Sequence, residues 1–90
     1  MFKLLIVEDD KDLNRTVCSY LSKNGYNCVG VTNVEDAYKA MDDNVFDMYI
    51  SDIMLPDISG YEFAKAVRAT DQETPILFIT ARDDFTSKQL

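Results

Sequence analysis

The alternation of short apolar runs with helix-like segments most constrains what this chain of 90 residues can fold into. Residues 4–7 and 75–79 are apolar at every position. Such runs are typical of strands that are covered on both faces of a parallel sheet. Strands separated by helices form right-handed βαβ units. The pattern therefore predicts one α/β domain, a three-layer sandwich with helices on both faces of a parallel sheet.

The predicted elements follow one another without a repeat or a linker. Asn27 and Gly30 interrupt the second run, which favours an edge strand there. Asn33 is a candidate cap for the helical segment after it, and Ser59 begins an S-x-x-E capping box. Predicted strands cover 2–7, 26–31, 46–51 and 75–79, and predicted helices cover 10–23, 34–43, 59–69 and a segment that begins at 83.

Composition argues against several functional classes. The net charge is −7 and no basic run is present, so we expect no nucleic-acid or membrane binding by this segment. The apolar runs are too short to span a membrane and no signal-peptide pattern is present, which predicts a cytoplasmic location. The chain has no histidine, which excludes imidazole-based zinc ligation and histidine-based nucleophilic catalysis. Cys18 and Cys28 lie among apolar residues, and we expect buried, reduced thiols.

Carboxylates close two of the predicted strands. Glu8 and Asp9 follow the first run, and Asp52 follows the run 46–51. The carboxyl ends of parallel strands lie along one edge of the sheet, where open α/β sheets bind ligands. Three carboxylates at this edge repel one another, and oxygen ligands of this kind suit Mg²⁺. The sequence therefore predicts a cation site.

Taken alone, Asp52 is open to several interpretations. A carboxylate in this place is suited to ligate a metal, to cap a helix, or to attack phosphorus as a nucleophile. An isolated aspartate in such a loop more often only forms a turn, and Asp10 fits the role of a helix cap. Thr80 ends the fourth strand, so its hydroxyl should reach the same edge and donate to a phosphoryl oxygen. Phosphoryl transfer needs little beyond alignment and charge neutralisation.

Three segments together resemble the motif regions of bacterial two-component response regulator receiver domains. Their order, spacing and positions at strand ends match over the whole chain. The resemblance implies a flavodoxin-like doubly wound sheet with strand order 2-1-3-4, lacking the fifth strand and last helix. The matching segments are Leu5-Ile6-Val7-Glu8-Asp9-Asp10, Asp52-Ile53-Met54-Leu55-Pro56-Asp57-Ile58-Ser59-Gly60 and Phe78-Ile79-Thr80-Ala81.

The resemblance also implies a role for each matching site residue. Asp52 would accept a phosphoryl group from a sensor histidine kinase. Asp9, Asp52 and the backbone carbonyl of Met54 would ligate Mg²⁺ (or Mn²⁺), and Glu8 would act through water. The remaining roles are the switch hydroxyl of Thr80, the space left for the phosphoryl group by Ala81, and the shaping of the loop by Pro56 and Gly60.

Receivers also carry a lysine at the end of a fifth strand, and no lysine of this chain occupies that position. We therefore expect residues 1–90 to be a receiver domain that is incomplete at the C-terminus. The strand 75–79 is apolar throughout, which is typical of a strand that is paired on both sides. Its outer edge would have no partner strand, and this predicts self-association of the chain through that edge. An output domain, most often one that binds DNA and regulates transcription, would lie outside the chain.

Other functional classes fit the sequence less well. A phosphatase with an aspartate nucleophile would resemble D-x-D-x-T after the strand, but Met54 occupies the second acidic position. A flavin-binding role conflicts with Glu8 and Asp9, which would repel a phosphate. A truncated or degenerate receiver that acts only as a protein-interaction module stays open as the alternative. We expect the chain to assist its own phosphorylation and dephosphorylation without being a turnover enzyme.

Overall fold

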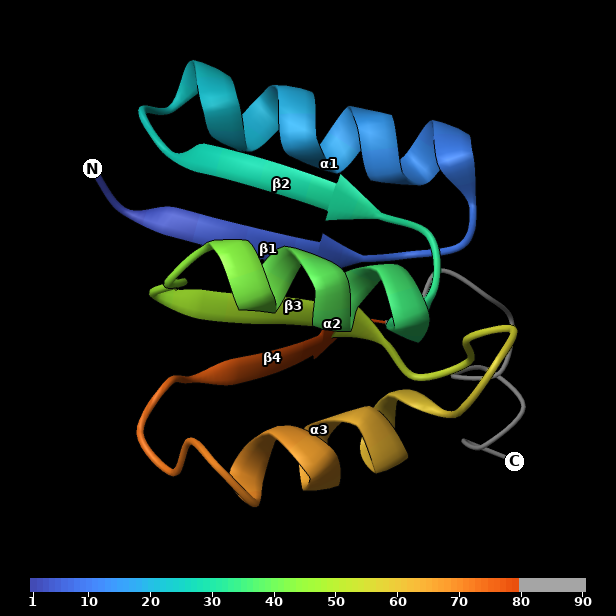
Figure 1. Ribbon diagram of the computed structural model, residues 1–90. Coiled ribbons are helices and arrows are strands. Elements are labelled where there is room, and N and C mark those ends of the chain that lie inside the picture. Colours follow the sequence, from blue (N-terminus) through green and yellow to red (C-terminus); the bar gives the residue numbers. More distant parts are fainter. Residues whose placement is uncertain (80–90) are drawn as a thin grey trace, which may run out of the picture.

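A parallel sheet of four strands forms the centre of the protein, with helices on both faces (Figure 1). The computed structural model describes residues 1–79. The strand order is β2-β1-β3-β4, so β1 and β3 are the two central strands. The elements in chain order are β1 (Lys3–Val7), α1 (Lys11–Lys23), β2 (Asn27–Val31), α2 (Val34–Asp43), β3 (Met48–Asp52), α3 (Gly60–Arg68) and β4 (Ile76–Ile79).

The two faces of the sheet bury separate apolar clusters. Side chains alternate along β1, so Leu5 lies on one face and Leu4 on the other. Helices α2 and α3 cover the larger cluster, which includes the fully buried Phe63. Helix α1 covers the smaller cluster, which includes Ile6 and Ile50. The predicted three-layer α/β architecture and the strand order 2-1-3-4 are confirmed.

Polar side chains begin each helix, because the first N–H groups of a helix lack partners within it. The Asp10 carboxylate accepts the N–H groups of Asp12 and Leu13 at 3.0 and 3.1 Å. Asn33 accepts the N–H of Asp36 at 2.8 Å. The predicted capping roles of Asp10 and Asn33 are therefore confirmed. Ser59 likewise accepts an N–H in the first turn of α3.

The third strand is offset from its predicted range of 46–51. It begins at Met48 and includes Asp52 as its last residue. The side chain of Phe46 is buried before the strand begins and packs against Tyr49, with ring centroids 5.9 Å apart. The run 46–51 therefore predicted the burial of Phe46 correctly, but the strand itself starts only at Met48. The correction places Asp52 on the sheet itself and not after it.

One face of the sheet carries an apolar groove beside α1, with a volume of about 440 Å³. Leu77 of β4 lines it and is 52% exposed. Within residues 1–79, β4 pairs with β3 alone, so its second edge has no partner strand in this part of the chain. No helix among these residues is long and apolar enough to cross a membrane. The groove residues are Phe2, Leu4, Leu21, Tyr26, Met48, Ile50 and Leu77.

Candidate metal centre

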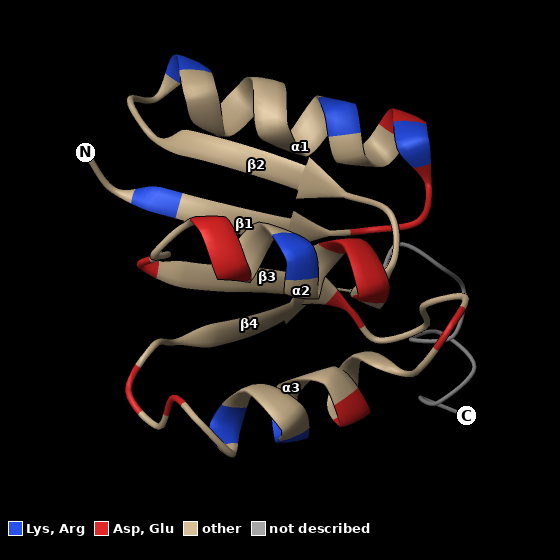
Figure 2. Ribbon diagram, in the orientation of Figure 1, with Lys and Arg blue, Asp and Glu red and all other residues tan. Residues whose placement is uncertain are grey.

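Acidic residues gather at the carboxyl ends of the two central strands (Figure 2). Val7 of β1 lies opposite Ser51 of β3 in the parallel register. The next residues along the two strands are Glu8 and Asp52, so the register brings them side by side. One oxygen from each of Glu8, Asp9 and Asp52 lies within 4.8 Å of the others. The predicted convergence of the three carboxylates is confirmed.

Two atoms of this cluster are buried without a hydrogen-bond partner. They are Glu8 Oε1 and Asp52 Oδ2, on side chains that are almost completely inaccessible. A buried carboxylate oxygen without a partner is energetically costly. A divalent cation bound among these oxygens would compensate both atoms. All the donor atoms are oxygens, and the half-buried Asp9 leaves one side of the cluster accessible to solvent. Such a set of donors fits Mg²⁺.

Burial and the neighbouring carboxylate also affect the pKa of Glu8. Burial is the largest of the causes that raise the pKa of Glu8 from 4.5 to about 7. The N–H of Asp10, which donates to Glu8 Oε2 at 2.9 Å, opposes this rise, and the negative charge of Asp52 adds to it. Near neutral pH the cluster therefore holds more negative charge than its surroundings stabilise.

The loop after β3 approaches Asp52 closely. The N–H of Met54 donates to Asp52 Oδ1 at 3.3 Å, while Oδ2 stays unpartnered. The N–H of Gly60 donates to the carbonyl of Ile53 at 2.7 Å. A Cβ at position 60 would lie 2.1 Å from the carbonyl oxygen of Asp52, so the backbone contact requires glycine. Pro56, the other predicted loop-shaping residue, is exposed in this loop.

Asn14 belongs to the site and was missed from the sequence. Its buried side-chain amide donates to the carbonyls of Glu8 at 3.0 Å and Val31 at 2.8 Å. These bonds fasten α1 to the ends of β1 and β2, beside the acid pair. A signal was present, since Asn14 shares the inward face of α1 with Cys18 and Leu21 at i, i+4 and i+7. A polar residue on such a face needs a buried partner.

The other residues predicted for the site lie outside the described residues. Ile79 pairs opposite Asp52, so β4 leads the chain to the same edge up to residue 79. Thr80 and Ala81, and the helical segment predicted from 83, are not among residues 1–79. The two cysteines are half-buried and not fully buried as expected, and burial raises the pKa of both thiols.

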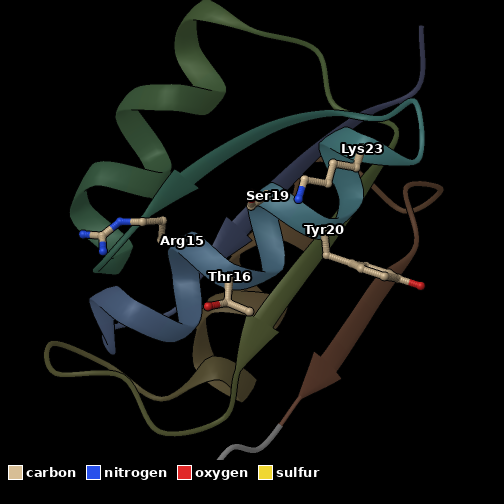
Figure 3. A pocket seen from close by; sticks show the side chains of 5 residues that line it. All are labelled: Arg15, Thr16, Ser19, Tyr20 and Lys23. Carbon is tan, nitrogen blue, oxygen red and sulfur yellow. The ribbon is translucent and has the colours of Figure 1, made fainter.

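A second hollow lies on the outer side of α1 and is separate from the carboxylates (Figure 3). Its volume is about 360 Å³. Arg15 and Lys23 lie toward opposite ends of this surface, with hydroxyl-bearing side chains between them (Figure 3). None of the three clustered carboxylates lines it, so the carboxylate cluster and this surface are distinct. The lining residues are Arg15, Thr16, Ser19, Tyr20 and Lys23.

The fold and the acidic edge define a flavodoxin-like α/β domain with a cluster of three carboxylates at the ends of its central strands. Residues 4–89 match the family described as response regulator receiver domain, and the chain belongs to this family. It is a receiver of two-component signal transduction. Transcriptional regulatory protein CssR of Bacillus subtilis is 40% identical over 82 residues, which are 91% of this chain and 36% of CssR.

Solved structures agree with this assignment. Response regulator TrrA of Thermotoga maritima, in complex with Mg²⁺ and BeF, has a TM-score of 0.86 and 30% identity, over 97% of this chain and 76% of that chain. A complex of histidine kinase ThkA with TrrA gives a TM-score of 0.83 and 30% identity, over 98% of this chain and 79% of the matched chain. By contrast, this chain spans about a third of the length of curated relatives such as CssR.

Proposed function

We propose that Asp52 is the phosphoacceptor and receives its phosphoryl group from a sensor histidine kinase. The observation that carries the proposal is the convergence of three carboxylates with two unpartnered buried oxygens, Glu8 Oε1 and Asp52 Oδ2. Asp52 Oδ1 accepts the N–H of Met54 and Oδ2 has no partner, so Oδ2 would face the bound cation and the carboxylate would attack phosphorus through its other oxygen. A bond from this oxygen to phosphorus would form as the bond from phosphorus to the donor nitrogen breaks.

The same residues fit a bound Mg²⁺ or Mn²⁺. Asp9, Asp52 and the backbone carbonyl of Met54 would hold the ion, and Glu8 would act through water. When bound, the ion supplies positive charge that neutralises the carboxylates and the phosphoryl oxygens. The chain's own contribution is to orient Asp52 through the Met54 N–H and to hold Glu8 in place through Asp10 and Asn14.

The partners follow from the family and its neighbours. TrrA is a response regulator solved with a histidine kinase, which supports a kinase as the donor for this chain. CssR is a transcriptional regulatory protein, which supports regulation of transcription by an output domain outside this chain. The net charge of −7 supports the absence of direct nucleic-acid contact by these residues. We place the protein in the cytoplasm, where its kinase would act.

The remaining roles complete this proposal. Thr80 would move toward the phosphoryl group as the switch, and Ala81 would leave room for it. The chain would assist its own phosphorylation and dephosphorylation but would not act as a turnover enzyme. Residues 1–90 would serve as the receiver module, and copies would associate through the edge of β4, which has no second partner strand among residues 1–79.

Phosphorylation by a small donor tests the proposal directly. The purified chain is treated with acetyl phosphate, with Mg²⁺ or with EDTA, and its intact mass is measured. We expect one phosphoryl group on the wild type with Mg²⁺ only, and none on Asp52→Asn. Asp47→Asn is the matched control, because Asp47 accepts the N–H of Lys3 at the opposite end of the sheet. Equal modification of wild type and Asp52→Asn would refute the assignment, and an unmodified wild type would favour the interaction-module alternative.

A further inference from the structure

The carboxylate of Asp57 ties the loop after β3 to the start of α2. It accepts the N–H of Val34 at 3.0 and 3.1 Å and the N–H of Glu35 at 3.1 Å. Within the loop it also accepts the N–H of Ile58 at 3.1 Å. A single side chain therefore joins two segments that are 22 to 23 residues apart in the sequence.

The contact provides acceptors for backbone N–H groups at the start of α2. The first N–H groups of α2 have no partners within the helix, and its own cap, Asn33, accepts only the N–H of Asp36. Asp57 takes two N–H groups that Asn33 leaves, and it places a negative charge at the positive end of the helix dipole. Burial alone would raise the pKa of Asp57, but the backbone N–H groups together hold that pKa below its usual value.

The loop has few other fixed points. Met54, Pro56, Asp57 and Ile58 are all exposed, while Leu55 packs against the larger apolar cluster. The Met54-to-Asp52 and Gly60-to-Ile53 hydrogen bonds connect residues that are close in the sequence. Apart from the Met54-to-Asp52 bond, which reaches back to the end of β3, the hydrogen bonds of Asp57 alone, among those of the described residues, connect the exposed part of this loop to another element. The backbone that follows Asp52 is therefore held at one end by Asp52 itself and at the other by the contact of Asp57 with α2.

We propose that Asp57 is a positioning residue of the metal and phosphoacceptor site. By fastening the loop to the start of α2, it fixes the backbone that follows Asp52 before any ligand binds. A site that is fixed in advance pays less ordering cost when its ligand arrives. The role rests on the function proposed for Asp52, and it adds a residue that touches neither the metal nor the phosphoryl group.

Alanine substitution at two matched carboxylates tests this role. Asp71 is the control, since its carboxylate accepts the N–H groups of Glu73 and Thr74 at 3.0 Å in the turn before β4, at the other end of the sheet. Asp57→Ala and Asp71→Ala each remove a carboxylate that holds a turn, but only Asp57 lies in the loop that follows Asp52. Asp57→Asn keeps one acceptor oxygen and provides a second, milder variant.

Three measurements are made on the full chain at a temperature where circular dichroism shows each variant folded. Magnesium titrations followed by NMR give the Mg²⁺ dissociation constant, and hydrogen exchange reports protection of the Val34 and Glu35 amides. Phosphorylation rates over a range of acetyl phosphate concentrations complete the set. We expect Asp57→Ala to weaken Mg²⁺ binding about tenfold, as loss of an outer-shell partner does, with Asp57→Asn between it and wild type. Asp71→Ala should stay within about twofold of wild type, because its turn does not support the site.

The outcomes separate this role from the proposed function. A wild-type chain that binds no Mg²⁺ and takes no phosphoryl group overturns the proposed function, and the role of Asp57 with it. A wild type that does both, with Asp57→Ala binding Mg²⁺ equally well despite lost protection of Val34 and Glu35, overturns the role of Asp57 alone. Equal weakening by Asp57→Ala and Asp71→Ala would also overturn it, since the cause would then be general loss of stability.

Discussion

Replacing Glu8 by glutamine should stabilise the metal-free protein, although the substitution removes a residue of the site. Glu8 is fully buried and lies beside Asp52, and its pKa is raised from 4.5 to about 7. Glutamine has nearly the same size and keeps an oxygen that can accept the N–H of Asp10. The substitution therefore removes the buried charge with little change in packing.

The direction of the pH dependence follows from the raised pKa. Between pH 4.5 and about 7 the folded state holds a proton on Glu8 that the unfolded state has lost. The stability that protonated Glu8 provides is fully present below pH 4.5 and is lost as the pH rises through about 7. At about 1.4 kcal/mol per pH unit, this rise in pKa corresponds to a loss of at most about 3 kcal/mol.

Urea unfolding followed by circular dichroism, in EDTA and from about pH 4.5 to about pH 8, measures this loss. We expect the free energy of unfolding of Glu8→Gln minus that of wild type to grow by up to about 3 kcal/mol across this range. Mg²⁺ should narrow the difference, because an ion that binds the folded wild type stabilises it. Glu62→Gln, at an exposed glutamate of α3, should show no such trend. A difference for Glu8→Gln that does not change with pH would refute the reasoning.

Three further substitutions test other contacts. Gly60→Ala should cost about 1–3 kcal/mol and weaken Mg²⁺ binding, because the new Cβ would meet the Asp52 carbonyl; an unchanged urea midpoint would contradict this. Asn14→Ala should cost about 1–3 kcal/mol, since it leaves the buried carbonyl of Glu8 without its side-chain donor. A loss no larger than that of a surface substitution, in thermal unfolding, would argue against it. Leu77→Lys should shift sedimentation of the chain toward the monomer, since Leu77 is exposed in the apolar groove; identical profiles at all concentrations would disprove association there.

Features that depend on local spacing could be predicted from the sequence. Helix caps at Asp10 and Asn33 follow from residue type and the segment that comes after them. The convergence of Glu8 and Asp52 followed from a general rule about parallel strands, and the observed register agrees with it. The start of β3 was predicted less well, because Phe46 is apolar and buried without being part of the ladder.

Features that depend on contacts between distant segments could not be predicted from local spacing. The inward position of Asn14 follows from helical spacing, but its hydrogen-bond partners, like those of Asp57, are in place only when α1 packs on β1 and the loop after β3 meets α2. The raised pKa of Glu8 likewise requires both burial and the approach of Asp52. Neither quantity is contained in the spacing of residues along the chain.

The sequence by itself determined the class of fold, the order of its elements and the edge at which the carboxylates gather. The spacing of apolar residues and the helix caps are local properties, and they predict where strands and helices lie. The right-handed connection of βαβ units then determines how these elements are arranged around the sheet. Only the tertiary structure decided which carboxylate oxygens lack partners and which side chain fastens the loop beside them. Those facts depend on distances of a few ångströms between segments about twenty residues or more apart, and close packing fixes such distances only when the whole domain has folded.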